Sequence, residues 1–482
     1  MMSTRRTAVR RAAAAGVALV AALGAACSRG GGGSFQSATP SAPGPSAEAS
    51  RSPGSSAADC PAAYVAPDPA RPRIRLSFDV ADGLATVHGT EHVEFTPDLP
   101  IRELVFRLTA NTEPSVQEGN SIVVDSVTAD PGGGAYRLDP DGASVRTQGG
   151  LLTVPLVGEL PAGRTVSADI AFTLRLGDGG FDRFGHVPSY AWWGSGQPLL
   201  AWERGVGWHR EPLLRFVGES ATSEAADIDL TVTAPQQYSV LASGTPDPPA
   251  DAGNGRRRWH SVAGTARDVS VAVGRFRVKE GTVAGARLRV GTPEGQPPSL
   301  LYGQHERAIR ELVRRFGPFP FPVLSVARLP VEGGGIEYPG SILMLGDDQL
   351  VAVHETAHQW FYGMVGDSQA RDPWLDEAFA TYAEQQVNGD GEPGALSMSG
   401  KVGGSMQDWG TDERGYYGVV YGKGAAALTA ARTAAGPARF DAALRCYVNA
   451  NAWRIAKPAD LARALAGLPA AVAVLRKAGA LP

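Results

Sequence analysis

Two histidines and an adjacent glutamate have spacings that suit a hydrolytic metal site. His354 and His358 are four residues apart, and Glu355 follows the first of them directly. If this segment is helical, the two imidazoles lie one above the other on one face, close enough to share an ion. Glu355 is rotated from His354 by about 100°, so its carboxylate reaches the open side of the metal rather than binding it. A metal with a base beside its open position is an arrangement for hydrolysis.

Glu377 supplies the expected third ligand. It follows His358 by 19 residues, a length that allows the first helix to end and an antiparallel helix to return a carboxylate to the metal. Two nitrogen donors, one oxygen donor and a free position favour zinc, with one Zn²⁺ per chain. Glu384 lies seven residues further on, back on the same helix face. It is either a partner of a ligating histidine or a solvated surface residue.

The elements that must position these residues are expected in an α+β domain over residues 281–482. Asp347 or Asp348 is a candidate cap for a helix that runs to about residue 365, and Pro373 suits the first turn of the next helix. Two short strands are expected beside them. The expected strands cover 324–329 and 341–345, and the expected helices cover 302–316, 348–365, 373–387, 415–435, 437–451 and a last one from 457.

Residues 73–280 predict a mostly antiparallel β-sandwich. Apolar and polar side chains alternate with a period of two in runs such as 74–78 and 166–176. Asp-Gly pairs at 82–83 and 141–142 are turn signals between such runs. No catalytic constellation is apparent in these strands, so the sandwich is expected to support the second domain rather than to carry the chemistry.

The first 26 residues are typical of an export signal. Arginines near the N-terminus are followed by a run of small and apolar residues over 12–26, too short to span a bilayer comfortably. The residues before Cys27 resemble a bacterial lipobox, which predicts a lipid anchor on that cysteine; plain cleavage after a small residue is the alternative. Residues 27–72 are rich in Gly, Ser, Ala and Pro and predict a flexible tether. We therefore expect an exported protein, held by lipid at the outer face of the cell membrane.

Composition narrows the range of partners. With 482 residues the chain is long enough for two to three domains, and its net charge of −4 gives it no electrostatic reason to bind nucleic acid. Cys60 and Cys446 either pair in the oxidising exterior or remain free thiols.

Beyond the ligand spacing, whole segments resemble the aminopeptidase N family of gluzincins, which includes the leukotriene-type epoxide hydrolase/aminopeptidases. The likeness is strong over about 300–460 and looser over the β domain, which the family also carries. It implies a thermolysin-like catalytic domain with zinc as its cofactor. The segments that carry the resemblance are His354-Glu355-Thr356-Ala357-His358-Gln359-Trp360-Phe361, 374–379, Phe316-Gly317-Pro318-Phe319-Pro320-Phe321-Pro322, Gly334-Gly335-Ile336-Glu337-Tyr338-Pro339-Gly340 and Val420-Tyr421-Gly422-Lys423-Gly424-Ala425.

The resemblance also implies roles for individual residues. Glu355 is the general base, and Tyr421 is the hydrogen-bond donor to the oxyanion, with Tyr416 and Tyr417 as nearby rivals. Glu337 is the anchor for a free α-amino group. Gly334 and Gly335 are expected in contact with the peptide backbone.

Two departures from the family pattern bear on specificity. Tyr338 stands where the family usually has Asn, and Glu203 is only a weak candidate for the second amine-binding residue of the β domain. The chain also ends about 120 residues after His358. Many family members carry a further helical domain there, so a more open cleft is expected.

The leading hypothesis is an exported zinc aminopeptidase that removes N-terminal residues from peptides, with Glu355 as base and Tyr421 stabilising the oxyanion. A zinc endopeptidase on the same site is the nearest alternative, favoured by an open cleft. A cell-surface binding lipoprotein with a vestigial site is an alternative of another class.

Overall fold

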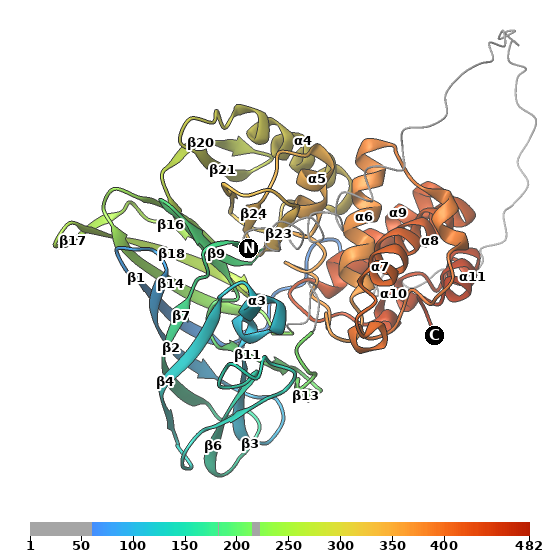
Figure 1. The fold of residues 1–482 in the computed structure, drawn as a ribbon. Helices are drawn as coiled ribbons and strands as arrows, with labels where there is room; N and C mark the ends of the chain where they lie inside the picture. Colours follow the sequence, from blue (N-terminus) through green and yellow to red (C-terminus); the bar gives the residue numbers. More distant parts are fainter. Residues whose placement is uncertain (1–59, 182, 215–221) are drawn as a thin grey trace, which may run out of the picture.

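A long β region and a mixed α/β region follow one another along the chain (Figure 1). The computed structural model describes residues 60–181, 183–214 and 222–482. We call residues 73–274 the β domain and residues 276–482 the C-terminal domain. Strand β20 (Phe276–Val283) crosses the boundary expected between residues 280 and 281. The expected order, a β domain and then an α+β domain with helices, is confirmed.

The β domain is built around an eight-stranded sheet with the order β16-β18-β14-β1-β2-β7-β4 and β17 paired to β18. Smaller sheets have the orders β15-β19-β10-β9-β8, β11-β3-β6-β5 and β12-β13. In β1 every second residue is buried, which is the period-two pattern of a strand with one face on the core. Neighbouring pairs are antiparallel except β1 and β14, which run parallel. The strands are β1 (Arg73–Val80), β2 (Thr86–Phe95), β3 (Ile101–Arg107), β4 (Ser121–Asp130), β5 (Arg137–Asp139), β6 (Leu151–Leu160), β7 (Val166–Arg175), β8 (Gly179–Phe181), β9 (Phe184–Val187), β10 (Tyr190–Gly194), β11 (Leu199–Leu200), β12 (Trp202–Glu203), β13 (Gly207–Trp208), β14 (Ala226–Pro235), β15 (Ser239–Ala242), β16 (Thr245–Pro246), β17 (Ala250–Gly253), β18 (Arg256–Ala266) and β19 (Ser270–Gly274).

The C-terminal domain combines a five-stranded sheet, ordered β20-β21-β22-β24-β23, with a group of helices. Figure 1 shows α4 and α5 beside this sheet and α6 to α11 gathered on the other side of α5. The remaining strands are β21 (Ala286–Pro293), β22 (Val323–Arg328), β23 (Gly335–Tyr338) and β24 (Ser341–Met344). The helices are α4 (Ser299–Phe316), α5 (Gln349–Ala357), α6 (Trp374–Asn388), α7 (Glu413–Tyr416), α8 (Gly424–Ala435), α9 (Pro437–Asn451), α10 (Pro458–Ala464) and α11 (Pro469–Ala478).

The two helices of the metal motif begin as expected, but α5 ends early. Asp348 caps α5, and its side chain accepts hydrogen bonds from the backbone of Leu350 and Val351. The helix ends at Ala357, so the expected extension to residue 365 is wrong. Turns follow Ala357 directly, and further along this stretch Tyr362 adopts a positive φ of 93°. Within the described residues, we find no helix with the length and apolarity needed to cross a membrane.

Residues 60–72, which we call the strap, join the start of the described chain to the C-terminal domain. The signal and most of the predicted tether, Cys27 included, lie outside the described residues. Cys60 forms a disulfide with Cys446 on α9, which settles the choice between paired and free thiols. The backbone N–H of Val65 donates to the carbonyl of Asn449, also on α9, at 3.0 Å.

The strap then crosses from one domain to the other. Trp360 Nε1 donates to the hydroxyl of Tyr64 at 3.2 Å, and that hydroxyl donates to the carbonyl of Pro318 at 2.5 Å. Further along, Arg71 pairs with Asp227 on β14, with 2.8 Å between Nη2 and Oδ2. The β domain is therefore held to the C-terminal domain through its N-terminal end as well as through the chain at residue 275.

We expect Cys446→Ser to lower the free energy of unfolding by about 2–5 kcal/mol, because the disulfide closes a loop of 386 residues and restricts the unfolded chain. Urea unfolding of the variant, with and without reductant, measures this. The wild-type protein under reductant serves as the control and should unfold like the variant. Equal midpoints for the oxidised wild type and the variant would show that the bond contributes nothing to stability.

Candidate metal centre

Helices α5 and α6 bring the three predicted metal ligands together. His354 lies on α5, His358 follows the last residue of that helix, and Glu377 lies in the first turn of α6. Glu377 Oε2 is 3.3 Å from His354 Nε2 and 3.4 Å from His358 Nε2. One donor atom from each residue lies within 4.8 Å of the other two. Two imidazole nitrogens and a carboxylate oxygen that converge in this way match the donor set of a zinc site with an open position.

Each imidazole is held on its other nitrogen by a carboxylate. His354 Nδ1 lies 3.3 Å from Glu384 Oε2, and His358 Nδ1 lies 2.5 Å from Asp376 Oδ1. A ring that donates its Nδ1 proton to a carboxylate keeps the Nε2 lone pair available and fixes the ring orientation. The structure therefore places Glu384 against a ligating histidine, the first of the two alternatives that its spacing allowed.

Asp376 is a functional residue that the sequence analysis missed. Its side chain is fully buried, and its second oxygen, Oδ2, accepts a hydrogen bond from Gln369 Nε2 at 3.1 Å. Neighbouring residues on a helix point about 100° apart, so Asp376 and Glu377 can approach His358 from different sides. The available signal was the acidic pair at 376–377 itself, of which only the second member was considered.

The charged groups of the centre depend strongly on one another. Burial raises the pKa of Glu377, but its hydrogen bonds with His354 and His358 outweigh burial and hold the pKa below its ordinary value. Glu377 is thus kept as a carboxylate, the form that binds a cation.

Glu355, the predicted base, is buried beside the candidate ligands with one carboxylate oxygen unpartnered among the described residues. It is 5% exposed, and its Oε2 has no hydrogen-bond partner among the described residues. Burial raises its pKa above the ordinary glutamate value, while the charges of His354 and His358 oppose the shift. Gly335 on β23 makes room for it, because a Cβ on that glycine would lie 2.4 Å from Glu355 Cγ. The glycine predicted to contact peptide therefore also sets the position of the base.

Glu337 faces the same centre from strand β23. It is 4% exposed, and a donor atom of Glu337, Glu355 and His358 each lies within 4.8 Å of the others. Its Oε1 has no hydrogen-bond partner in the described part of the chain. Burial raises the pKa of Glu337 to about 8, and the neighbouring carboxylates add to the shift. A buried acid with an unpartnered oxygen is a site for a cationic group that arrives with a ligand.

Tyr338 points away from that site because side chains alternate along a strand. It is fully buried, and its hydroxyl accepts a hydrogen bond from Arg183 Nη1 at 3.0 Å. Its ring lies against Gly194 of the β domain, where a Cβ would come within 2.0 Å of it. The replacement of the family's usual Asn by Tyr338 therefore affects the contact between domains rather than the surroundings of Glu337.

Tyr421 lies beside the first ligand. It belongs to a π-helical segment, Tyr417–Lys423, and its ring is parallel to that of His354, with 5.9 Å between centroids and 4° between planes. Lys423 holds the segment in place, donating to the carbonyl of Met398 at 2.8 Å and that of Gly400 at 2.6 Å. Widened helical turns of this kind occur often at functional sites, and this one aligns Tyr421 with the metal ligands.

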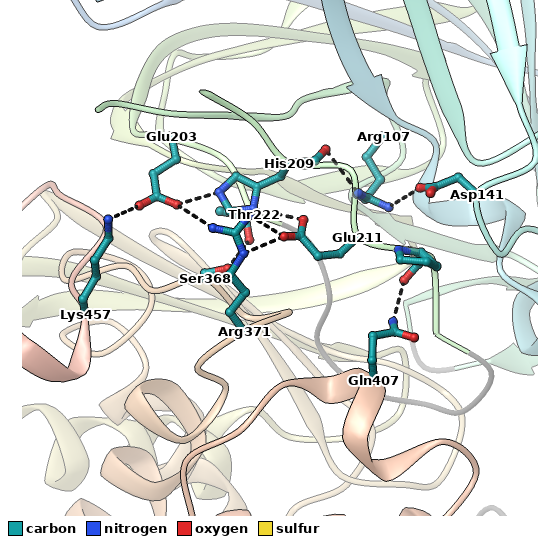
Figure 2. A network of polar contacts seen from close by, with 11 residues as sticks. Arg107, Asp141, Glu203, His209, Glu211, Thr222, Ser368, Arg371, Gln407 and Lys457 are labelled. Carbon is teal, nitrogen blue, oxygen red and sulfur yellow. Dashed lines mark hydrogen bonds and ion pairs between the residues drawn. The ribbon is translucent and has the colours of Figure 1, made fainter. Parts of the chain in front are cut away.

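Gly334 and Glu203, the two other residues proposed from the sequence for substrate binding, have different positions. The carbonyl of Gly334 accepts a hydrogen bond from the backbone of Leu345 at 2.8 Å, so it contributes to the sheet edge beside Glu337. Glu203 contacts His209 and Lys457 at the boundary between the domains (Figure 2). This placement argues against Glu203 as an amine-binding residue.

We expect Glu384→Ala to weaken zinc affinity by about 10–100-fold, because His354 loses the acceptor that orients its ring. Titration of zinc into chelator-treated protein, in competition with a dye, measures this. Asp390→Ala removes an exposed carboxylate just beyond α6 and is the matched control. Equal zinc affinity in the two variants would show that Glu384 does not support the site.

Comparisons with known proteins agree with this geometry. No protein-family model matches the chain. Aminopeptidase M1-A of Oryza sativa subsp. japonica is 26% identical over 237 residues, which is 41% of this chain and 27% of the relative. Aminopeptidase RNPEPL1 of Mus musculus is 29% identical over 98 residues, 18% of this chain and 14% of the relative. The chain thus aligns with about a quarter or less of the length of these curated relatives.

Solved structures match over most of the chain. The M1 zinc metallopeptidase from Deinococcus radiodurans superposes with a TM-score of 0.62 at 21% identity, covering 85% of this chain and 93% of that one. A structure described as a two-domain M1 zinc metallopeptidase mutant with bound L-arginine gives a TM-score of 0.62 at 20% identity, covering 85% and 94%. The β domain and the C-terminal domain together therefore have the two-domain fold of the M1 zinc metallopeptidases.

Proposed function

We propose that the chain is a zinc aminopeptidase that acts outside the cytoplasm and removes N-terminal residues from peptides. The observation that carries this proposal is Glu337, a buried acid with an unpartnered oxygen beside Glu355 and His358. Hydrolysis needs the ligands and the base, whereas recognition of a free amino group needs one further anion close by. Both curated relatives described above are named aminopeptidases, and the Deinococcus enzyme has also been solved as a mutant with the substrate Tyr-Ser-Ala.

His354, His358 and Glu377 would hold the zinc ion. The bound ion supplies Lewis acidity, which lowers the pKa of a water molecule to about 7 and polarises a carbonyl. Glu384 and Asp376 keep the two imidazoles oriented for this role through their Nδ1 atoms.

Glu355 is the general base in this proposal. Its free Oε2 takes a proton from the attacking water and later gives it to the leaving amine. Burial raises its pKa toward the working pH, which is the condition for both steps of a proton transfer.

Tyr421 donates a hydrogen bond to the oxyanion that forms at the scissile carbonyl. Burial raises the pKa of Tyr421 well above 10, and the nearby charge of Glu377 adds to the shift. The hydroxyl therefore keeps its proton at neutral pH and acts as a donor. A donor of this kind contributes about 3 kcal/mol to lowering the barrier.

Glu337 binds the α-ammonium group of the substrate. Because the pKa of Glu337 is raised to about 8, the free acid holds a proton near neutral pH, and an arriving ammonium group favours its charged form. A peptide with a blocked N-terminus brings no such charge. This is the step that separates an aminopeptidase from the endopeptidase alternative.

Export and a lipid anchor at Cys27 are the second part of the proposal. The Cys60–Cys446 disulfide supports export, because disulfides persist outside the cytoplasm and are rare in reducing compartments. The basic and apolar segment before Cys27 supplies the signal.

We expect Glu355→Gln to reduce peptide hydrolysis by about 10²–10⁴-fold with bound zinc unchanged, because the ligands remain and only the base is lost. Initial rates on amino-terminal fluorogenic substrates, with zinc content determined on the same samples, measure this. Glu413→Gln is the control for a change outside the ligand and base set. Equal, near-zero rates for wild type and Glu355→Gln over a broad peptide panel would favour the binding lipoprotein.

Glu337→Gln tests the recognition of the amino group with the same assays. We expect a loss of about tenfold or more on free N-termini, since a charge-assisted contact is lost, and little change on internally quenched peptides with blocked N-termini. Rapid cleavage of the blocked peptides by the wild type, unaffected by this variant, would identify an endopeptidase instead.

We expect Cys27→Ala to move the protein from the membrane fraction to the soluble exported fraction, because the acceptor of the lipid is lost. Immunoblotting of fractionated cells measures this. A wild-type protein that is already soluble outside the cell would contradict the anchor and leave plain secretion.

A further inference from the structure

A second cluster of buried ionisable groups lies outside the metal centre, where the β domain meets the C-terminal domain (Figure 2). His209 follows strand β13 and is 1% exposed. Its Nε2 lies 2.6 Å from Glu203 Oε2, and its Nδ1 lies 3.1 Å from Glu211 Oε2. The function described above uses none of these three residues.

The geometry sets the protonation state of His209. Ionised carboxylates only accept hydrogen bonds, so a ring with a carboxylate oxygen at each nitrogen must carry a proton on both. Burial lowers the pKa of His209, but the hydrogen bonds with Glu203 and Glu211 outweigh it and raise the pKa above its ordinary value. A neutral ring would turn a lone pair toward one of the two carboxylates and break that contact.

Two cations of the C-terminal domain complete the cluster. Lys457 Nζ lies 3.1 Å from Glu203 Oε1, and Arg371 Nε donates to Glu211 Oε1 at 2.6 Å. Each of the four carboxylate oxygens therefore contacts a positively charged group, and His209 serves two of them. His209 and Glu203 are buried, whereas the side chains of Arg371 and Lys457 are 42% and 51% exposed, so the cluster runs from the buried boundary between the domains to the surface.

Three further charged groups face the cluster. Arg107 Nη2 donates to the backbone carbonyl of His209 at 3.4 Å, and Arg107 Nη1 pairs with Asp141 at 3.1 Å. Burial raises the pKa of Asp372 to about 6, and the charge of Arg371 opposes the shift. Among the described hydrogen bonds, none joins Arg107, Asp141 or Asp372 to a candidate metal ligand.

Arg371 lies in a loop of the C-terminal domain that leads directly to the metal centre. It lies in the loop between His358 and α6, and it precedes by two residues Pro373, which caps α6. The same loop carries Gln369, whose side chain donates to Asp376, the partner of His358. A displacement of Arg371 can therefore move the candidate ligands in two ways. It can shift the start of α6, which carries Glu377, or shift Gln369, which holds Asp376 against His358.

We propose that Glu203, His209 and Glu211 form a latch that grips Arg371 and positions the loop and the start of α6 for metal binding. His209 and Arg371 are positioning residues in this proposal, since neither touches the metal ligands. The inference rests on the metal centre and does not require that the substrate be an N-terminal peptide.

The latch depends on pH in a defined direction. Because the pKa of His209 is raised in the folded protein, its stabilisation is complete below the ordinary histidine value and is lost as the pH rises through the folded-state value. The latch is therefore closed below the ordinary histidine pKa and opens as the pH rises through the raised pKa of His209.

Zinc affinity, measured by competition with a chelating dye, tests the proposal separately from catalysis. We expect Arg371→Gln to bind zinc about tenfold more weakly than the wild type at neutral pH, while Arg371→Lys, which keeps the charge, stays within about threefold. Arg210→Gln is the matched control. Arg210 lies between His209 and Glu211 in the sequence, but it pairs with Glu103 within the β domain. A wild-type protein that binds zinc but hydrolyses no peptide would count against the proposed function and not against the latch.

Two further measurements exclude a merely structural effect. The affinity ratio between wild type and Arg371→Gln should shrink toward one as the pH rises, because the wild-type latch opens, and His209→Gln should remove this pH dependence. The NMR signals of the His209 ring should show two protonated nitrogens at neutral pH. If Arg371→Gln fails to fold, Glu211→Gln takes its place. Zinc affinity equal to wild type in the folded variant at all pH values, or a singly protonated His209, would overturn the proposal.

Discussion

An excess of buried carboxyl groups over basic groups is the constraint on which the rest of the structure depends. Glu337, Glu355, Asp376 and Glu377 are all buried around His354 and His358. Two imidazoles cannot neutralise four ionised carboxylates, and unpaired buried charge is costly, so Glu337 holds a proton near neutral pH until a cation arrives. The centre is therefore built to receive cations, and the two that fit the chemistry are a divalent metal between the histidines and an ammonium group at Glu337.

The surrounding fold holds these carboxyl groups in position. Strand β23 places Glu337 toward the centre and Tyr338 toward the β domain, and Gly335 on the same strand gives Glu355 its room. Among its described residues the β domain contributes none of the candidate metal ligands, and its Gly194 packs against Tyr338 of β23. Ser270 on β19 donates to Ser341 on β24 at 2.8 Å, so the two domains also meet through polar contacts.

Local patterns predicted the parts of the site that lie close together in the sequence. The spacing of His354 and His358 and the capping by Asp348 follow from helix geometry. The structure shows Asp348 at the N-cap of α5, His354 in the helix and His358 directly after it. The early end of α5 was missed because residues 358–362 contain no Gly or Pro to signal the turns that begin after Ala357. Asp376 was missed because its role depends on where α6 packs, which the spacing alone does not give.

The sequence alone did not predict the contacts between distant segments. Glu203 was only a weak candidate for amine binding, yet it contacts Lys457 of the C-terminal domain, and Glu211 contacts Arg371 across 160 residues. Nothing in the local pattern of either segment indicates the other, because the match is one of charge and position in space. The same holds for the two cysteines, for which pairing and free thiols were equally open.

The route of the strap has a mechanical consequence. Force applied to the chain before residue 60 enters the folded protein at Cys60 and passes through a covalent bond directly into α9. The load therefore reaches the domain that carries the metal ligands without first pulling on the β sheets or on the boundary between the domains. With the lipid anchor proposed at Cys27, tension from the membrane would therefore leave the contact between the two domains unloaded.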